Sequence, residues 1–202
     1  MHIINKAVTL IESMLEDCGI SDNAVVLEQE KDVVRCAYEQ GALIRVTFGG
    51  QSAGIATNDP IRTRTKPSFM FGASLNKPGL RSAAAGIINV LTGFLCTSRR
   101  LHACNPDYHT PCNAELSARI TGKKIWCCGQ MQPVRDQFSA HLVEMAGDAD
   151  LILVTADGMV SDEGGLIPEE PGDGVLFIGP STAGVASLIH GCHFCPYGRT
   201  NL

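Results

Sequence analysis

Apolar side chains near the start of the chain recur at the spacing of one helical face. This stripe consists of Ile4, Ala7, Val8, Ile11, Met14, Leu15 and Cys18. Gly19 follows it as a stop signal, so the pattern predicts an opening helix over residues 4–18. A second stripe of the same period predicts a helix over residues 80–96, with Pro78 near its start.

Between these two helices, runs rich in Val and Ile predict extended segments separated by polar or glycine turns. They cover residues 24–29, 32–38, 42–48 and 51–57, and Gly49-Gly50 predicts a hairpin turn between the last two. The short basic run over residues 62–67 is interpreted as a solvated loop, with an anion site as the alternative. Helix, antiparallel strands and helix together indicate a small α+β domain.

The second half of the chain has a different pattern, in which apolar strands alternate with helices. A polar connection over residues 98–113 suggests a junction between two domains, 1–100 and 101–202, and Thr110-Pro111 predicts a helix that stops at Gly122. Continuous apolar strands are predicted over residues 124–128, 151–155 and 175–179, and a helix from Pro133 through His141 to Met145. Apolar strands that alternate with helices indicate a Rossmann-like parallel sheet covered on both faces, so the predicted fold class is α/β.

Composition narrows the class of protein. The chain has 202 residues, of which 45% are hydrophobic and 18% charged, a globular balance. A formal net charge of -5 argues against a nucleic-acid partner. Neither a secretory signal nor a membrane-spanning stretch is evident, so a cytoplasmic protein without a membrane partner is expected. In that reducing compartment the nine cysteines are expected to be free thiols, metal ligands or redox groups.

Three predicted strand ends carry residues suited to a small ligand. In an open parallel sheet, ligands bind beyond the carboxyl ends of the strands. The residues there are Gly129, Thr155, Asp157, Gly179, Pro180, Ser181 and Thr182. They suit a carboxylate, phosphate or ribose, although no dinucleotide or P-loop motif is present. The alternative is that Ser181 only caps the last helix.

Two groups of cysteine and histidine stand out as candidate metal ligands. The first comprises His102, Cys104, His109 and Cys112, and the second comprises His190, Cys192, His193 and Cys195. Thiolate and imidazole suit soft or borderline ions such as zinc, nickel, cobalt, copper or iron. Neither group has the paired spacing of established zinc modules, and packing or surface roles are the alternative. Cys127 and Cys128 lie in a predicted strand, so at least one is expected in the core, and His141 is expected to pack in its helix.

Several segments together resemble a family of putative heavy-metal chelation proteins. The resemblance is carried by residues 42–47, 53–56, 81–89, 122–125, 149–155 and 178–182. That family joins an enolase-N-terminal-like α+β domain to a Rossmann-like domain, with a proposed site between them. The resemblance implies site roles for Asn89, Gly129, Thr155 and the turn from Gly179 to Thr182. The two Cys/His groups are not part of the shared pattern.

These observations lead to one main functional expectation and two alternatives. The main one is a metal-handling protein that binds a transition metal, or a metal-bearing small molecule, in the cleft between the domains. The first alternative is an enzyme acting on a nucleotide-like or other small anionic ligand at the strand ends, with structural cysteines. The second is a homo-oligomeric scaffold. No nucleophile, base and orienting group form a convincing catalytic set, so whether the chain is an enzyme stays open.

Overall fold

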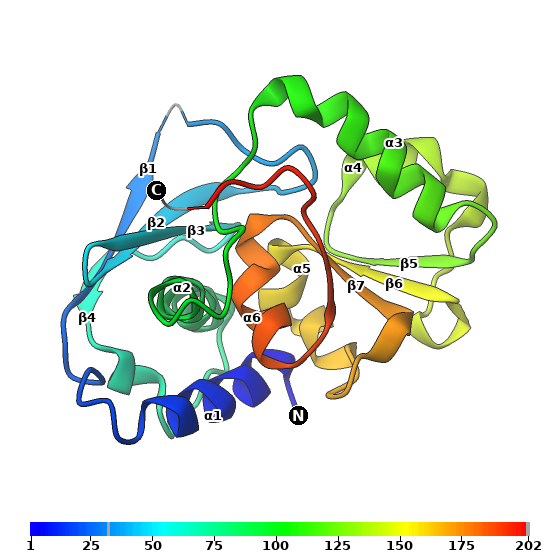
Figure 1. Cartoon of the computed structure of the whole chain (residues 1–202). Helices are drawn as coiled ribbons and strands as arrows, with labels where there is room; N and C mark the ends of the chain where they lie inside the picture. Colours follow the sequence, from blue (N-terminus) through cyan, green and yellow to red (C-terminus); the bar gives the residue numbers. More distant parts are fainter. Residues whose placement is uncertain (32, 201–202) are drawn as a thin grey trace.

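The computed structural model describes residues 1–31 and 33–200, which form two four-stranded sheets with helices around them (Figure 1). The helices are α1 (Ile3–Leu15), α2 (Pro78–Phe94), α3 (His109–Ile120), α4 (Gln132–Gln137), α5 (Ala156–Val160) and α6 (Ala183–Leu188). The strands are β1 (Val25–Glu30), β2 (Ala42–Phe48), β3 (Gln51–Thr57), β4 (Thr63–Thr65), β5 (Ile125–Cys128), β6 (Leu151–Val154), β7 (Val175–Ile178) and β8 (Cys192–Phe194). The predicted α/β class, an antiparallel-sheet half followed by a Rossmann-like half, is confirmed.

The first sheet is antiparallel, with strand order β3-β2-β1-β4. The predicted hairpin between β2 and β3 is confirmed, and Phe48 pairs with Gln51 across it. Gly49 and Gly50 have φ angles of 55° and 81°. A two-residue hairpin turn with both φ values positive matches the twist of the strands, and glycine adopts it without steric strain.

Helix α2 fills the space between the two halves of the molecule. Figure 1 shows it end-on, with β2 and β3 on one side and α6 on the other. Its middle consists of small residues, Ala83, Ala84, Ala85 and Gly86, all buried. A Cβ atom at Gly86 would lie 2.8 Å from a methyl group of Val46, so this helix packs closer to the sheet than a larger residue would permit. The two sheets therefore share one core through α2.

The second sheet is parallel, with strand order β5-β6-β7-β8, and both faces are covered. Alternate strand residues enter different hydrophobic clusters, because successive side chains in a strand point to opposite faces. Cys128 belongs to the cluster shared with α1 and α2, whereas Cys127 packs with Leu116 of α3 and Val134 of α4. The expectation that one of these cysteines is buried is confirmed, and both are.

One predicted strand is wrong. Asp32, its first residue, lies outside the described residues, and residues 33–40 contain no strand. The reason is that β1 already pairs directly with β2, with Glu30 opposite Leu43, so this segment is the connection between them. It crosses instead towards the parallel sheet, where Tyr38 reaches Asn113 of α3 and Glu39 reaches Ser181.

The helix predicted from Pro133 to Met145 is also too long. Helix α4 ends at Gln137, because the chain then turns back to lie beside β5, where the N–H of Val143 donates to the carbonyl of Ile125 at 2.9 Å. His141 is consequently exposed and does not pack in a helical stripe.

Three further predictions change in detail. Helix α3 begins at His109, so Thr110 lies inside it and does not cap it. The basic run contains the short edge strand β4, which pairs with β1 and leaves Thr63 and Arg64 exposed. The sequence pattern gave no sign of β8, which places Cys192 and His193 of the second Cys/His group at the sheet edge.

Two broader features bear on function. Within residues 1–31 and 33–200, no helix is long and apolar enough to cross a membrane. All nine cysteines lie in this part of the chain and are free thiols.

Candidate functional site

The predicted residues after β5 and β6 are joined by hydrogen bonds at the carboxyl edge of the parallel sheet. Thr155 follows β6, and its hydroxyl donates to the Asp157 carboxylate at 2.7 Å. The other oxygen of that carboxylate accepts the N–H of Gln130 at 2.8 Å, which joins the ends of β5 and β6. Gly129 donates its N–H to Glu163 at 3.3 Å. The network fixes the loop geometry here and leaves Asp157 mostly buried.

The turn from Gly179 to Thr182 is anchored within the protein. The N–H of Ser181 donates to the Glu39 carboxylate at 2.9 Å, and the Ser181 hydroxyl accepts the N–H of Ala56 in β3 at 3.0 Å. Thr182 donates its hydroxyl to the carbonyl of Gly179 at 2.9 Å. Ser181 makes no side-chain cap of α6, so the capping alternative is wrong. The turn joins the two sheets.

Asn89 of α2 completes this junction. Its amide nitrogen donates to the carbonyls of Gly54 at 3.0 Å and Ser181 at 2.8 Å, and its amide oxygen accepts the N–H of Gly184 at 2.9 Å. The side chain is fully buried. Asn89 therefore links β3, the turn and α6, a role that places it beside the predicted site.

Glu39 is the residue at this junction that sequence reasoning missed. Its carboxyl group is buried, and burial raises its pKa from 4.5 to about 7, with the nearby Asp157 charge acting in the same direction. A Cβ atom at Gly179, where φ is 88°, would lie 2.5 Å from the Glu39 oxygen. The only local signal was a charged residue placed between Tyr38 and the Gly41 turn.

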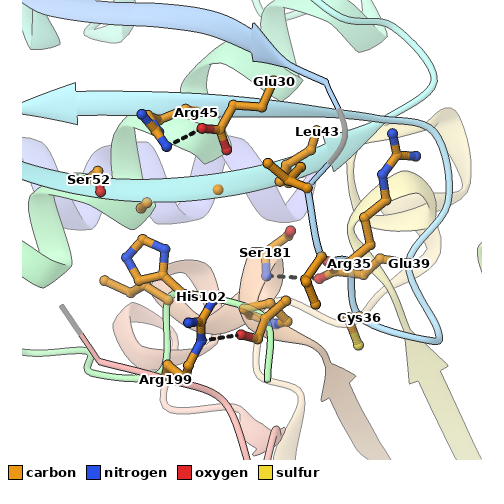
Figure 2. A pocket seen from close by; sticks show the side chains of 17 residues that line it. Glu30, Arg35, Cys36, Glu39, Leu43, Arg45, Ser52, His102, Ser181 and Arg199 are labelled. Carbon is orange, nitrogen blue, oxygen red and sulfur yellow. Dashed lines mark hydrogen bonds and ion pairs between the residues drawn. The ribbon is translucent and has the colours of Figure 1, made fainter. Parts of the chain in front are cut away.

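Two cavities border these residues. One of about 210 Å³ lies between the sheets and is lined by residues that include Cys36, Glu39, Pro180, Ser181 and Arg199. Figure 2 shows Glu39 directed to Ser181, with Cys36 and Arg35 on the same connection. The other, about 820 Å³, is more open and includes Gly129 and Asp157 in its lining. The predicted ligand-binding residues are thus divided between two cavities and the packed junction.

Four thiols from distant parts of the chain influence one another electrostatically, and one of them, Cys36, lines the smaller cavity. Cys104, Cys112 and Cys195 come from the two predicted groups, and Cys36, which sequence reasoning missed, joins them. Burial raises the pKa of Cys195 to about 12, and the charges of Glu39, Cys104 and Cys112 add to the effect. The pKa of Cys36 is likewise raised by burial, with contributions from Glu39, Cys195 and Cys112. Charges interact this way only when they are close.

Contacts between residues next to these thiols join the segments that carry them. The Tyr38 hydroxyl donates to Asn113, next to Cys112, at 3.2 Å. His102 and Arg199 exchange two backbone hydrogen bonds, and the Arg199 side chain donates to the carbonyl of Ala103, next to Cys104, at 2.7 Å. Tyr108 stacks on Tyr197 with 4.9 Å between ring centroids. The linker and the C-terminal segment therefore run side by side.

The other predicted ligands have different surroundings. Cys192 contacts Asp173 at 3.6 Å, and His193 bonds to the carbonyl of Gly179 at 2.9 Å through Nε2. These two neighbours point to opposite faces of β8. His190 is exposed beyond α6, at a φ of 54°. His109 lies one turn before Cys112, and its buried Nε2 has no hydrogen-bond partner among the described residues.

Comparison with known proteins leaves the family open. No family model and no curated protein matches the chain. Among solved structures, it is similar to a protein of unknown function from the DUF364 family of Pyrococcus horikoshii. The identity is 12%, the TM-score is 0.44, and the match covers 89% of this chain and 79% of that chain. A likeness at this level assigns neither family nor function, so the resemblance to heavy-metal chelation proteins stays a prediction.

The junction between the sheets contains groups that could bind a cation or an anion. It combines four buried or half-buried thiols, a buried carboxyl group and a cavity bordered by arginines. Within the described residues, no three His, Cys, Asp or Glu side chains are arranged to hold one metal ion. Thiols and arginines respectively suit soft cations and small anions.

Proposed function

We propose that this chain is a metal-handling protein that binds a soft or borderline transition metal through thiols at the junction of its two sheets. The observation that carries the proposal is the convergence of Cys104, Cys112 and Cys195. These cysteines belong to two groups separated by most of the second half of the chain, yet the charge of Cys104 raises the pKa of Cys112 and of Cys195, and the charge of Cys112 also raises that of Cys195.

Ligand chemistry supports a cation at this place. A thiol must lose its proton to bind a metal, and burial makes the charged form of Cys104, Cys112 and Cys195 unfavourable while no cation is present, with the charge of Glu39 adding to the effect at Cys195. A bound cation reverses this balance, because it neutralises several thiolates at once. Thiolate donors favour zinc, copper(I) and iron over magnesium or calcium.

The junction also explains why the fold would place such a site here. Cys36 lines the cavity between the sheets, and Glu39, on the same connection, is bonded to the turn after β7. A metal held by the thiols would therefore lie beside a space that accepts a small molecule. The proposal includes the reducing environment that free thiols require, as in the cytoplasm.

Metal analysis tests the proposal directly. The full chain is purified without oxygen or added metal, and its metal content is measured for the wild type and for Cys112→Ser combined with Cys195→Ser. The control combines Cys18→Ser with Cys96→Ser, since both of these cysteines are exposed and lie outside the cluster. We expect bound metal in the wild type and the control only. Equal metal content in all three proteins would refute the proposal.

A second candidate is an enzyme or binding protein for a small anionic ligand. The observation that favours it is the cavity of about 210 Å³, whose lining includes Arg35, Arg45 and Arg199. Arginine recognises carboxylates and phosphates through paired hydrogen bonds. Figure 2 shows these three side chains around the cavity, with Arg45 paired to Glu30.

Ligand screening by thermal shift separates this candidate from the first. A specific ligand raises the melting temperature by mass action, so nucleotides and small dicarboxylates are tested on the wild type, on Arg35→Gln and on the thiol variant. A shift lost in Arg35→Gln and retained in the thiol variant would favour the anion-binding function. Absence of any shift would count against it.

A further inference from the structure

The cavity between the two sheets is small and carries charged groups of both signs. Its volume is about 210 Å³, below the about 300–1,000 Å³ of pockets for drug-sized ligands. This is the space of about seven molecules of liquid water at about 30 Å³ each, so a ligand of roughly six to ten non-hydrogen atoms fits inside it. A nucleotide is too large to lie inside, so the size narrows the anion-binding candidate to small molecules.

Arg199 presents a fixed donor for a carboxylate to this cavity. Its Nε–H donates to the carbonyl of Ala103 at 2.7 Å, which orients the guanidinium group. In the described part of the chain, the two terminal nitrogens of Arg199 make no further hydrogen bond and no ion pair, whereas Arg45 is paired with Glu30. Arginine recognises a carboxylate through paired N–H donors, so Arg199 has the free donors and the unbalanced charge for one.

Glu39 supplies an acid to another wall of the cavity. The residue is 5% exposed, and its carboxyl group accepts the N–H of Ser181 at 2.9 Å (Figure 2). Burial and the charge of Asp157 raise the pKa of this carboxyl group to about 7, and the effects that oppose them are hydrogen bonds from Ser181. Among the described residues, Glu39 therefore has no cation as a partner.

An ammonium group on a ligand would supply this partner. It brings a positive charge and three N–H donors, which favour the charged form of a buried carboxyl group. An α-amino acid carries an ammonium group and a carboxylate on the same carbon atom, so one small molecule can satisfy both Glu39 and Arg199. The lining also includes Leu43, Ala53 and Leu101, whose apolar surface can receive the rest of the molecule.

We propose that the cavity between the sheets binds a small α-amino acid, with its carboxylate on Arg199 and its ammonium group on Glu39. This inference rests on the anion-binding candidate, whose ligand class it names, and it is independent of the metal-binding proposal. Because the ligand carries both charges, the site should distinguish it from a plain carboxylate of the same size and shape.

Matched pairs of ligands test the inference. Isothermal titration calorimetry on the full chain compares alanine with propionate, valine with 3-methylbutanoate, and aspartate with succinate, since the members of each pair differ in the ammonium group. We expect at least one amino acid of the panel to bind. Its analogue without the ammonium group should bind at least about tenfold more weakly, the factor that a hydrogen bond between charged groups supplies.

Variants assign the two ends of the ligand. Arg199→Gln should weaken both members of the binding pair at least about tenfold, because both lose the partner of their carboxylate. Glu39→Gln should weaken the amino acid without weakening its analogue, so the preference between them disappears; its amide oxygen can still accept the N–H of Ser181. Arg64→Gln is the control, since Arg64 is exposed in β4 and does not line the cavity, and it should bind like the wild type.

The outcomes separate this inference from the anion-binding candidate. If a carboxylate binds through Arg199 as tightly as the matching amino acid, the inference is overturned and the anion-binding function stands. If no member of the panel binds but inorganic phosphate does, the result is the same. If neither the panel nor phosphate binds to the wild type, both fail.

Two further results complete the test. A preference for the amino acid that persists in Glu39→Gln shows that Glu39 is not the partner of the ammonium group, and this also overturns the inference. Arg199→Lys keeps the charge without the paired donors, and it covers the case in which Arg199→Gln does not fold. It should weaken both members of the pair, and unchanged binding would contradict the assignment of Arg199.

Discussion

The side-chain amide of Asn89 donates a hydrogen bond of 2.8 Å to the backbone carbonyl of Ser181, which joins the central helix α2 to the turn after β7. The same side chain also binds Gly54 and Gly184, so a single buried residue holds together the strand, the turn and the helix that border the candidate site. The relative positions of these three segments therefore depend on Asn89.

Replacing Asn89 should destabilise the fold strongly. Asn89→Ala leaves two carbonyls and one N–H without partners in the core, and each unsatisfied buried group costs about 1–3 kcal/mol. We expect the free energy of unfolding, measured in urea, to fall by at least about 3 kcal/mol. Asn23→Ala is the matched control, because Asn23 is exposed, and should change it by less than about 0.5 kcal/mol. Equal effects of the two substitutions would contradict this role for Asn89.

Glu39 should make the metal-free fold less stable as the pH rises. Its pKa is 4.5 ordinarily and about 7 in the fold, so between these values the folded chain binds more protons than the unfolded chain. The contribution of the neutral carboxyl is complete below pH 4.5 and is lost as the pH rises through about 7. The difference corresponds to about 3 kcal/mol.

Glu39→Gln isolates this effect, because the amide oxygen can still accept the N–H of Ser181. We expect the variant to gain about 2.5 kcal/mol relative to the wild type when urea unfolding is compared at about pH 5 and about pH 8. Contributions of other groups, such as the half-buried His193, are common to both proteins. The exposed Glu144→Gln serves as the control and should show no such gain. Parallel pH profiles for the wild type and Glu39→Gln would rule out the buried acid.

Gly158 of α5 should tolerate no side chain. A Cβ atom there would lie 2.1 Å from the carbonyl carbon and oxygen of Cys128, which are backbone atoms of β5 packed in the core and cannot move aside without disturbing the sheet. Gly158→Ala should therefore lower the free energy of unfolding by about 3 kcal/mol or more. Urea unfolding of both variants checks this. Gly147→Ala, at an exposed position where a Cβ meets no atom within 4 Å, should leave the free energy of unfolding almost unchanged.

The thiols should react with alkylating reagents in an order set by burial. Burial raises the pKa of Cys112 to about 11 and of Cys195 to about 12, so near neutral pH few of these thiols are in the reactive thiolate form. In the native metal-free protein, mass spectrometry should find iodoacetamide first on the exposed Cys18 and Cys96. Early labelling of Cys195 would show that the cluster is open to solvent.

Local pattern was sufficient for the elements whose partners are close in sequence. The hairpin of β2 and β3 follows from alternating residues on both sides of Gly49-Gly50, and the apolar runs of β5, β6 and β7 follow from a sheet buried on both faces. Local pattern gave a wrong prediction at residues 33–38. The composition of this segment is typical of a strand, but β2 already pairs with β1, so the segment has no place in the sheet.

The candidate site was predictable in ligand type and not in geometry. Cys104, Cys112 and Cys195 could be recognised because cysteines and histidines are grouped around them. Cys36 and Glu39 could not, since their roles arise from the way one connection crosses to the parallel sheet. Similarly, a Gly-Pro-Ser-Thr turn after a strand is compatible with a ligand site or with a helix cap. Only the hydrogen bonds of Ser181 show that this turn joins the two sheets.

The gathering of the four cysteines also has a consequence for the order of folding. Cys36 and Cys195 are separated by most of the chain, so the loop that their approach closes is among the longest in the molecule, and long loops cost more entropy to close. Contacts of this kind slow folding, whereas the pairing of β2 with β3 needs only a two-residue turn. During refolding in air, these thiols would consequently spend the longest time apart and exposed to oxidation, before the two sheets dock and cover them.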